Sequence, residues 1–253
     1  MAGNFSGTNN YLNISTPVAI NTLSNSNVFT TMCWFTTPDF TTGTVSNEGG
    51  IFSQQLDTVY HETFFIGYIL SGANRVLETY VDTGPAGGSG TASSQWQTLG
   101  TTALQVNTLY HYALVWNGAA TNKGSLYLNG VLDGTNTAAD ALNIKSSTAP
   151  FIIGGWIGSA GTTLTEDFPG QIEDVRIYNR ALSSSEIQTI YGCRGTDGIV
   201  NGLVARYALQ GQSGVNITSE TDLSGNSQTL NVVTVAPTYA SDLILSLTRP
   251  PQG

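Results

Sequence analysis

The chain has 253 residues and a mass of 26.7 kDa, a length that suits one all-β sandwich or barrel without requiring a second domain. Only 10% of the residues are charged, far below the roughly 25% that is usual in soluble domains. With 8 basic and 17 acidic residues the net charge is -9, which opposes binding to phosphate backbones and excludes nucleic acid as an expected partner.

No stretch of the sequence predicts a membrane span, an export signal or a disulfide scaffold. The longest apolar run, "APFIIGGWIG" from Ala149 to Gly158, is half the ~20 residues that a spanning helix needs. The opening "MAGNFSGTNNYLNIS" has neither the basic nor the apolar region of a Sec signal peptide. Cys33 and Cys193 predict two buried thiols, with a bridge between them as the alternative. We therefore expect a soluble protein with no membrane partner.

Short segments of alternating apolar and polar residues follow one another along the chain, separated by Gly, Asn, Asp and Pro. This pattern is typical of antiparallel sheets. The expected strands are Val28–Thr36, Glu62–Leu70, Val76–Asp82, Leu109–Trp116, Gly124–Leu128, Pro150–Gly154 and Gln171–Tyr178. The segment "NGAATNKGS" predicts a hairpin between the fourth and fifth strands, and Asn129-Gly130 predicts a tight turn after the fifth. The glycine-rich segment Gly84–Ser94 predicts a surface loop.

One helix is expected, directly after the last of these strands. Ser183 and Glu186 have the spacing of a capping box, in which each side chain bonds to the backbone N–H of the other residue. Gly192 marks the expected end, where a left-handed residue follows a helix. The face that would pack on the sheet contains Ile187, Ile190 and Tyr191. A helix of about two turns is marginal alone, so we expect it to lie on an apolar surface.

At residues 168–191 the run "FPGQIEDVRIYNRALSSSEIQTIY" resembles the closing signature of the laminin-G/concanavalin A-like sandwich family. The segments "YHYALVWNG", "LYLNG" and "FIIGG" resemble the central hairpin of that family and the strand after it. The segments "NFSGTNNYLNI" and "FTTMCWF" resemble its first two strands. The resemblance covers residues 4–191 and implies an all-β, two-layer antiparallel concanavalin A-like jelly-roll sandwich with one short capped helix.

The opening strand of this family, G-L-V-A-x-Y with a D-x-S-G-N turn, has its counterpart at the other end of the chain. "NGLVARYALQG" at residues 201–211 and "DLSGN" at residues 222–226 are similar to it, which implies a circular permutation. We therefore expect residues 1–235 to form a single sandwich that residues 199–230 complete, followed by an extended tail at residues 236–253. A second, truncated domain is the alternative, but so few residues would not bury a core. A tail strand over Leu243–Leu247 would pack on its own sandwich or on a neighbour.

The acidic pair Glu173 and Asp174 is the first candidate site. Adjacent strand residues point to opposite faces, so one carboxylate is expected to turn inward or toward the rim, where Arg176 or Arg180 would neutralise it. The family resemblance implies an alternative, because relatives often hold one structural Ca²⁺ with an acidic residue at the position that matches Glu173. Calcium needs six to eight oxygen ligands, and one local pair supplies too few.

Motifs for catalysis are missing from the sequence. Relatives that cleave β-glucans carry E-x-D-x-E or a close variant on one strand. The nearest match here, "ETDLS" at Glu220–Ser224, lacks a third carboxylate and is expected in a turn. No zinc, nucleophile or phosphate-loop motif is present. His61 and His111 stand beside aromatic residues and are expected to be ordinary sheet residues. We therefore expect a protein that is not an enzyme.

Binding is the function that remains, and tryptophans are the candidate contacts. Trp96 and Trp156 are expected at partly exposed loop positions, where a ring either stacks on a sugar or packs into the core. Trp34 and Trp116 lie in expected strands and are assigned to the core.

Two kinds of protein fit these expectations. The first is a non-catalytic virion surface protein, a capsid decoration or fibre protein. It would assemble in the host cytoplasm and contact other virion proteins or further copies of itself, with host-surface glycans as a further possible partner. The second is a bacterial glycan-binding lectin or adhesin, or an accessory module of a carbohydrate-active enzyme, exported by a route other than Sec. The portion from "DGIVNGLVARY" to "APTYASDLILSL" resembles phage and environmental viral sequences, which favours the first.

Overall fold

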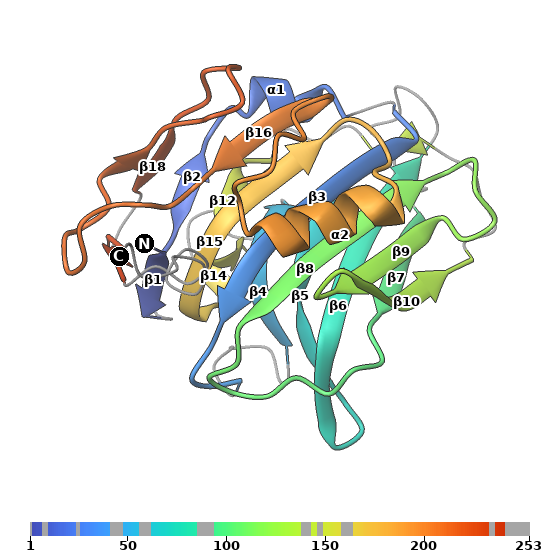
Figure 1. Cartoon of the computed structure of the whole chain (residues 1–253), viewed down its shortest axis with the longest axis horizontal. Helices are drawn as coiled ribbons and strands as arrows, with labels where there is room; N and C mark the ends of the chain where they lie inside the picture. The colour runs from blue at the N-terminus through green and yellow to red at the C-terminus, as the bar shows by residue number, and fades with distance from the viewer. Residues whose placement is uncertain are drawn as a thin grey trace, which may run out of the picture.

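Two antiparallel sheets pack face to face in the computed structural model of the chain (Figure 1). The structure describes residues 2–6, 10–23, 26–40, 48–55, 62–84, 94–137, 143–145, 149–157, 164–232 and 236–240. The strands expected from the sequence are present with their ends within two residues of the predicted bounds, and Val28–Thr36 and Gly124–Leu128 match them at both ends. The predicted two-layer all-β sandwich is therefore confirmed.

The sheet nearer the viewer in Figure 1, here called the front sheet, has the order β10-β9-β8-β3-β15-β1-β19, with β16 also paired to β15. Its strands are β1 (Gly3–Ser6), β3 (Val28–Thr36), β8 (Tyr110–Asn117), β9 (Gly124–Leu128), β10 (Val131–Asn136), β15 (Pro169–Tyr178), β16 (Leu203–Tyr207) and β19 (Thr238–Tyr239). The turn between β9 and β10 has positive φ at Asn129 and Gly130, as expected for an Asn-Gly hairpin.

Behind it lies the back sheet, with the order β11-β6-β5-β4-β12-β2-β18-β17 and with β7 paired to β6. Its strands are β2 (Leu12–Ile14), β4 (Glu48–Gln55), β5 (Glu62–Ser71), β6 (Asn74–Gly84), β7 (Ser94–Leu99), β11 (Asn143–Ile144), β12 (Phe151–Ile153), β17 (Ser219–Glu220) and β18 (Leu230–Val232). A small third sheet pairs β13 (Gly155–Ile157) with β14 (Leu164–Asp167).

Aromatic side chains fill the space between the two large sheets. The ring of Phe52 lies 6.3 Å from the rings of both Phe64 and Tyr112 and 6.1 Å from that of Phe151. Trp116 is fully buried in the same core, as expected. Because alternate residues of each strand enter this core, the other residues point to the two outer faces of the sandwich.

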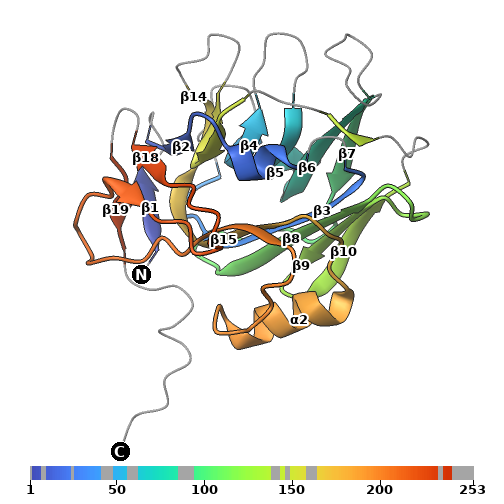
Figure 2. The same cartoon turned by 90° about the horizontal axis from the view of Figure 1, so that it is seen from above.

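Helix α2 (Ser184–Cys193) lies on the outer face of the front sheet (Figure 2). The expected capping box is present: Glu186 N donates to Ser183 Oγ (3.3 Å) and Ser183 N donates to Glu186 Oε2 (2.9 Å). Beneath the helix, Trp34 is buried but stacks on Tyr191 at 5.4 Å, so it belongs to this outer cluster and not to the core between the sheets.

Two expectations about helices were wrong. The helix continues through Gly192 to Cys193, and the left-handed residue that follows it is Arg194 (φ 47°), which donates its N–H to Ile190 O. The stacking of Tyr191 on Trp34 holds the last turn in helical form beyond the glycine. The structure also has a second helix, α1 (Val18–Asn21), which is too short to give a periodic sequence signal. No helix in the described part of the chain is long and apolar enough to cross a membrane.

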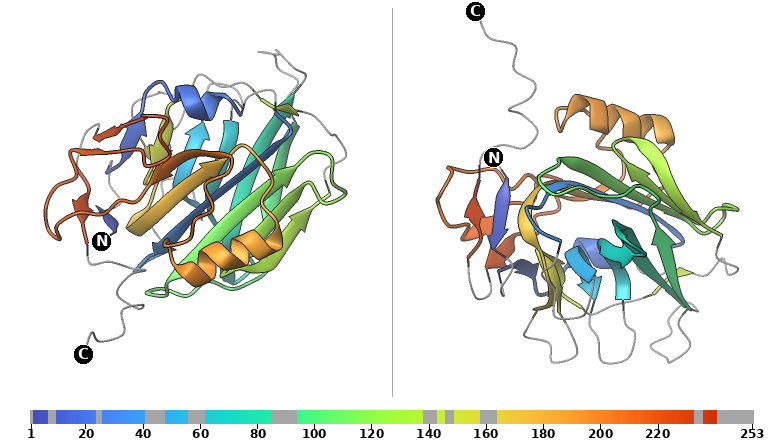
Figure 3. Two further views of the ribbon diagram at one scale, coloured as in Figure 1. Left: turned by 45° about the horizontal axis from the view of Figure 1, so that its top comes forward. Right: turned by 90° about the horizontal axis from the view of Figure 1, so that it is seen from below.

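Strands from both ends of the chain lie end to end along one edge of β15. Residues 3–6 of β1 pair with residues 172–169, while β16 pairs Tyr207 with Val175 and Leu203 with Tyr178. The two ends of the described chain are neighbours, since Ala240 N donates to Ala2 O at 2.7 Å (Figure 3). Residues 203–207 therefore extend the same sheet as residues 169–178. The predicted strand Leu243–Leu247, most of the predicted loop Gly84–Ser94, and His61 lie outside the described residues.

Candidate functional site

The outer face of the back sheet lies on the opposite side of the sandwich from α2 (Figure 2). On β5, β6 and β7 the residues that alternate with the core residues point to this face. We call the following group the back face: Phe65, Gly67, Glu78, Tyr80 and Gln97. The register places Phe65, Tyr80 and Gln97 in one row across the three strands and Gly67 and Glu78 in the next. Side chains that are distant in sequence therefore meet on one surface.

Two aromatic rings form the centre of the back face. The Phe65 ring lies over Gly67, because a Cβ at that glycine would stand 2.6 Å from the ring. Tyr80 lies beside it, with ring centroids 6.0 Å apart, and its side chain is partly exposed whereas Phe65 is buried. The buried ring thus supports an accessible one.

Glu78 places a buried carboxyl group beside these rings. Its Oε1 accepts a bond of 2.5 Å from Gln97 Nε2, which also donates to Tyr80 Oη at 2.8 Å. Its Oε2 is buried and has no hydrogen-bond partner in the described part of the chain. Burial raises the pKa of Glu78 to about 7, and the negative charge of Glu48 on β4 adds to the rise. The group therefore titrates near neutral pH.

Replacing Glu78 with glutamine should change how stability depends on pH. A folded-state pKa of about 7 against 4.5 in the unfolded chain means that the native protein holds this proton more tightly, so stability falls as pH rises from 4.5 to 7. In E78Q that loss is absent. We expect urea denaturation to show the variant gaining on the order of 3 kcal/mol over the parent between pH 4.5 and pH 8. For E186Q the difference in unfolding free energy from the parent should stay nearly constant over this pH range, because Arg180 lowers the pKa of Glu186 to about 2.

The β13–β14 hairpin borders the back face on the side of β4. Ser53 Oγ on β4 donates to Gly155 O at 3.1 Å. A Cβ at Gly50 would lie 3.2 Å from both the Phe65 ring and the Trp156 backbone N. Trp156 therefore lies on a strand next to Phe65, with a partly buried side chain whose Nε1 has no partner in the described structure.

Trp96 takes a different position from the expected one. It lies on β7, not on a loop, and its side chain packs against the core between the sheets while Nε1 donates to Thr83 Oγ1 at 2.9 Å. Its neighbours Gln95 and Gln97 are exposed on the outer side, as is Leu99. Core packing is therefore the role that the geometry gives to Trp96.

The pair Glu173 and Asp174 lies on the far side of the molecule, at the outer face of the front sheet. Asp174 has φ 51° within a β-bulge, which places both carboxylates on one side of β15, so the expected alternation of faces fails there. Both side chains are buried. Gln210 Nε2 donates to Glu173 Oε1 at 3.1 Å.

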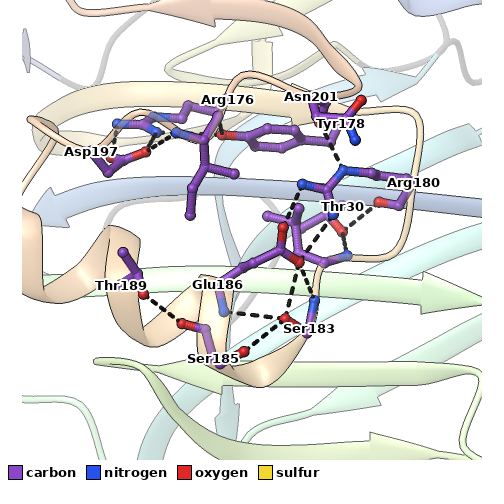
Figure 4. Close-up of polar contacts among 12 residues, drawn as sticks. Thr30, Arg176, Tyr178, Arg180, Ser183, Ser185, Glu186, Thr189, Asp197 and Asn201 are labelled. Atoms are coloured by element: carbon purple, nitrogen blue, oxygen red, sulfur yellow. Dashed lines mark hydrogen bonds and ion pairs between the residues drawn. The ribbon is translucent and has the colours of Figure 1, made fainter.

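Each carboxylate oxygen of Asp174 is paired with an arginine. Arg176 Nη2 lies 2.6 Å from Oδ2, and Arg206 Nε, from β16, lies 2.8 Å from Oδ1. Arg176 also pairs with Asp197 at 2.9 Å (Figure 4). Arg180 was expected to neutralise the acidic pair but binds Glu186 of α2 at 2.6 Å. It lies at the end of β15, where the chain turns toward the helix.

This arrangement does not fit a calcium ion. A cation would have to displace two guanidinium groups from the oxygens of Asp174, and the positive charges of the arginines would repel it. Among the described residues no group of three or more His, Cys, Asp or Glu side chains is placed to hold a metal. The main prediction, neutralisation by arginine, holds for Asp174 through Arg176.

The remaining sequence candidates in the described part of the chain are one histidine and the two cysteines. His111 is buried under α2 at 4.9 Å from Trp34, and burial lowers its pKa to about 3, so the ring is neutral. Both cysteines are free thiols; Cys33 is buried as expected, whereas Cys193 at the end of α2 is only partly buried.

The sequence predicted the strand Val76–Asp82, but the role of its outward-facing residues in the back face was missed. The segment "ETYVD" on β6 alternates Glu78, Tyr80 and Asp82 with inward-facing residues, which was a readable signal. Glu78 and Asp82 are four strand residues apart, or about 13 Å between Cα atoms. In the E-x-D-x-E pattern of relatives that cleave β-glucans the middle position is also a carboxylate, whereas here it is Tyr80.

Comparison with known proteins agrees with this fold. A pentraxin from Limulus polyphemus has 20% identity and a TM-score of 0.55, with 77% of this chain and 83% of the pentraxin covered. A candidate carbohydrate-binding protein from Bacteroides ovatus has 19% identity and a TM-score of 0.61; the alignment covers 94% of this chain and 60% of that longer chain. The CBM40 module of a Ruminococcus gnavus sialidase, bound to α2,3-sialyllactose, has 16% identity and a TM-score of 0.56, with 76% of this chain and 97% of the module covered.

No curated protein matches the chain in sequence. A family model does: residues 6–188 match the concanavalin A-like lectin/glucanases superfamily. The match spans most of the chain, and the solved structures share the same sandwich. The resemblance found in the sequence motifs is thereby confirmed, and the chain belongs to the concanavalin A-like lectin/glucanases superfamily.

Proposed function

We propose that the back face binds a glycan without chemically changing it. The observation that carries the proposal is the Tyr80 ring, supported by Phe65 and flanked by the exposed amide of Gln97, which is bonded to the buried carboxyl group of Glu78. An aromatic ring stacks on the apolar face of a sugar, and carboxyl and amide groups bond its hydroxyls. Small polar groups around an apolar centre are the composition of a ligand site.

The solved relatives support this proposal at the level of ligand class. The Ruminococcus gnavus module binds sialyllactose, and the Bacteroides ovatus protein is a candidate carbohydrate-binding protein. These proteins share the sandwich at low identity, so the choice of residues rests on the geometry of the back face alone.

The proposal predicts which substitutions abolish binding. A glycan array should identify ligands of the full chain, and calorimetry should then show that Tyr80→Ala and Gln97→Ala each weaken binding at least tenfold, or about 1.4 kcal/mol. Trp156→Ala tests whether the bordering hairpin contributes. Gln188→Ala, exposed on α2, should bind like the parent. Parent protein that binds no glycan, or that binds unchanged after loss of Tyr80, would contradict the proposal.

The non-catalytic part of the proposal needs its own test, because a carboxyl group that titrates near pH 7 suits acid–base chemistry. Incubating the parent with each bound glycan should release no new reducing ends. Turnover that disappears in E78Q would overturn this part and leave binding intact.

We also propose a virion surface as the place where this module works, as a capsid decoration or fibre protein that assembles in the host cytoplasm beside other virion proteins or further copies of itself. The weakly charged composition and the resemblance of the C-terminal portion to phage sequences support it. Electron microscopy of the source particle tests it. A coding neighbourhood of polysaccharide-degrading genes would favour the alternative, a bacterial lectin, adhesin or accessory module.

A further inference from the structure

We infer that the back face selects uncharged sugars and rejects sugars that carry a carboxylate, such as sialic and uronic acids. This inference names the ligand class of the glycan site and rests on the proposed function. It also separates this chain from its structural relative that binds a sialylated glycan. Three features of the back face carry it: the sign of its charges, the position of the nearest cation, and the hydrogen bonds of Gln97.

The ionisable groups nearest the ring pair are acidic. Glu78 adjoins Tyr80 on β6, and Glu48 lies two strands away on β4, close enough to raise the pKa of Glu78. The pKa of Glu48 is itself raised by burial, since its side chain is partly buried. Charges in such a partly dry setting act more strongly than they do in solvent. The carboxylate of a sugar stacked on Tyr80 would be repelled by these negative charges.

The cationic side chains in the described part of the chain are not placed to pair with a ligand carboxylate on the back face. Lys145 follows β11, and its backbone N–H donates to Asp82 O, two residues along β6 from Tyr80, but its side chain is only 4% exposed and is not available to pair with a ligand. Arg75 is on β6 but has the orientation of Leu77, whose side chain enters the core. The others belong to the front sheet, its hairpins or α2: Lys123, Arg176, Arg180, Arg194 and Arg206.

The hydrogen bonds of Gln97 determine what kind of group completes the site. Glu78 is fully buried, so its unpartnered Oε2 is out of reach of a ligand. Gln97 is exposed, and its Nε2 already donates to both Glu78 and Tyr80, which leaves its amide oxygen to accept a bond from a ligand. Sugar hydroxyls are donors, whereas an ionised carboxylate only accepts hydrogen bonds. The amide oxygen of Gln97 therefore favours a hydroxyl and disfavours an acid.

Matched glycan pairs test the inference. An array of neutral oligosaccharides, each printed beside the same structure ending in sialic or glucuronic acid, should show binding of the neutral members; lactose and α2,3-sialyllactose form one such pair. Calorimetry at pH 8, where Glu78 is charged, should then give at least tenfold tighter binding of the neutral member. The double variant Glu48→Gln, Glu78→Gln should reduce the ratio of the affinities for the neutral and the acidic member severalfold. Glu186→Gln, which removes one charge on the opposite side, should leave the ratio unchanged.

The outcomes separate the two proposals. Equal or tighter binding of the acid-terminated members would overturn the inference and leave glycan binding standing. A ratio that does not change in the double variant would also overturn it, because another cause would then set the preference. Absence of binding to every array member would remove the proposed function and, with it, the inference.

Discussion

Arg176→Met is expected to lower the free energy of unfolding by about 3 to 5 kcal/mol, the cost of removing one member of a buried ion network. The Arg176 side chain is 1% exposed and bridges Asp174 and Asp197, which are themselves buried. Methionine matches the arginine stem in shape, so the main loss is electrostatic: Asp197 would keep its negative charge without a cation. Urea denaturation at pH 7, followed by tryptophan fluorescence, measures the change.

Two further variants separate the effect of the buried ion network from the effect of losing any arginine. The double variant Arg176→Met, Asp197→Asn should recover much of the loss, since it removes the orphaned charge, and Arg206 still binds Asp174. Arg180→Met breaks the half-exposed pair with Glu186 and should cost only about 1 kcal/mol or less. Equal costs for the two arginine variants would show that the buried network has no special weight.

Removing residues 196–253 is expected to prevent cooperative folding. The segment supplies large buried side chains to the sandwich: Val204, Tyr207, Leu209, Ile217 and Leu230. At roughly 1.5 to 3 kcal/mol each, their loss equals the roughly 5 to 15 kcal/mol that stabilises a typical domain. Circular dichroism and a missing denaturation midpoint would show the effect. A truncated chain that unfolds cooperatively would mean that residues 199–230 do not complete the sandwich.

The circular permutation itself remains a proposal, and reordering the chain tests it. A variant that begins at Thr196, runs to Ala240, continues through a short Gly/Ser linker into Ala2 and ends at Gly195 retains β16 and β1 on the edge of β15. The Ala2 and Ala240 backbones are already bonded, so the linker spans little space. We expect a cooperative midpoint close to that of the parent. A reordered chain that does not fold would contradict this prediction and indicate that the fold requires the parent chain order.

Local signals carried much of the fold. The capping box of α2 and the hairpin at Asn129-Gly130 depend on residues within a few positions of each other, so their spacing alone specifies them. The strand Val28–Thr36 was predicted at both ends because an apolar run ends at polar and turn-forming residues. The end of α2 was mispredicted at Gly192 because Trp34, distant in sequence, holds Tyr191 against the sheet.

The candidate site depended on contacts that the chain order hides. Tryptophans were the natural glycan candidates, yet Trp96 turns inward, and its neighbour Gln97 reaches the outer face, because one step along a strand changes the face. Glu173 and Asp174 were expected on opposite faces, but a bulge held by Arg206 and Ala208 brings both to one side. Neither Arg206 nor Ala208 is near them in sequence.

The sequence by itself determined the class of fold, the family and the boundaries of the main strands, because these depend on periodicity and on short motifs read in order. Only the tertiary structure decided which carboxylates meet arginines and which stand beside aromatic rings on the back face. The physical reason is that the ionisation and exposure of a side chain depend on neighbours brought by other strands. Register and bulges set those neighbours, and local pattern does not encode them.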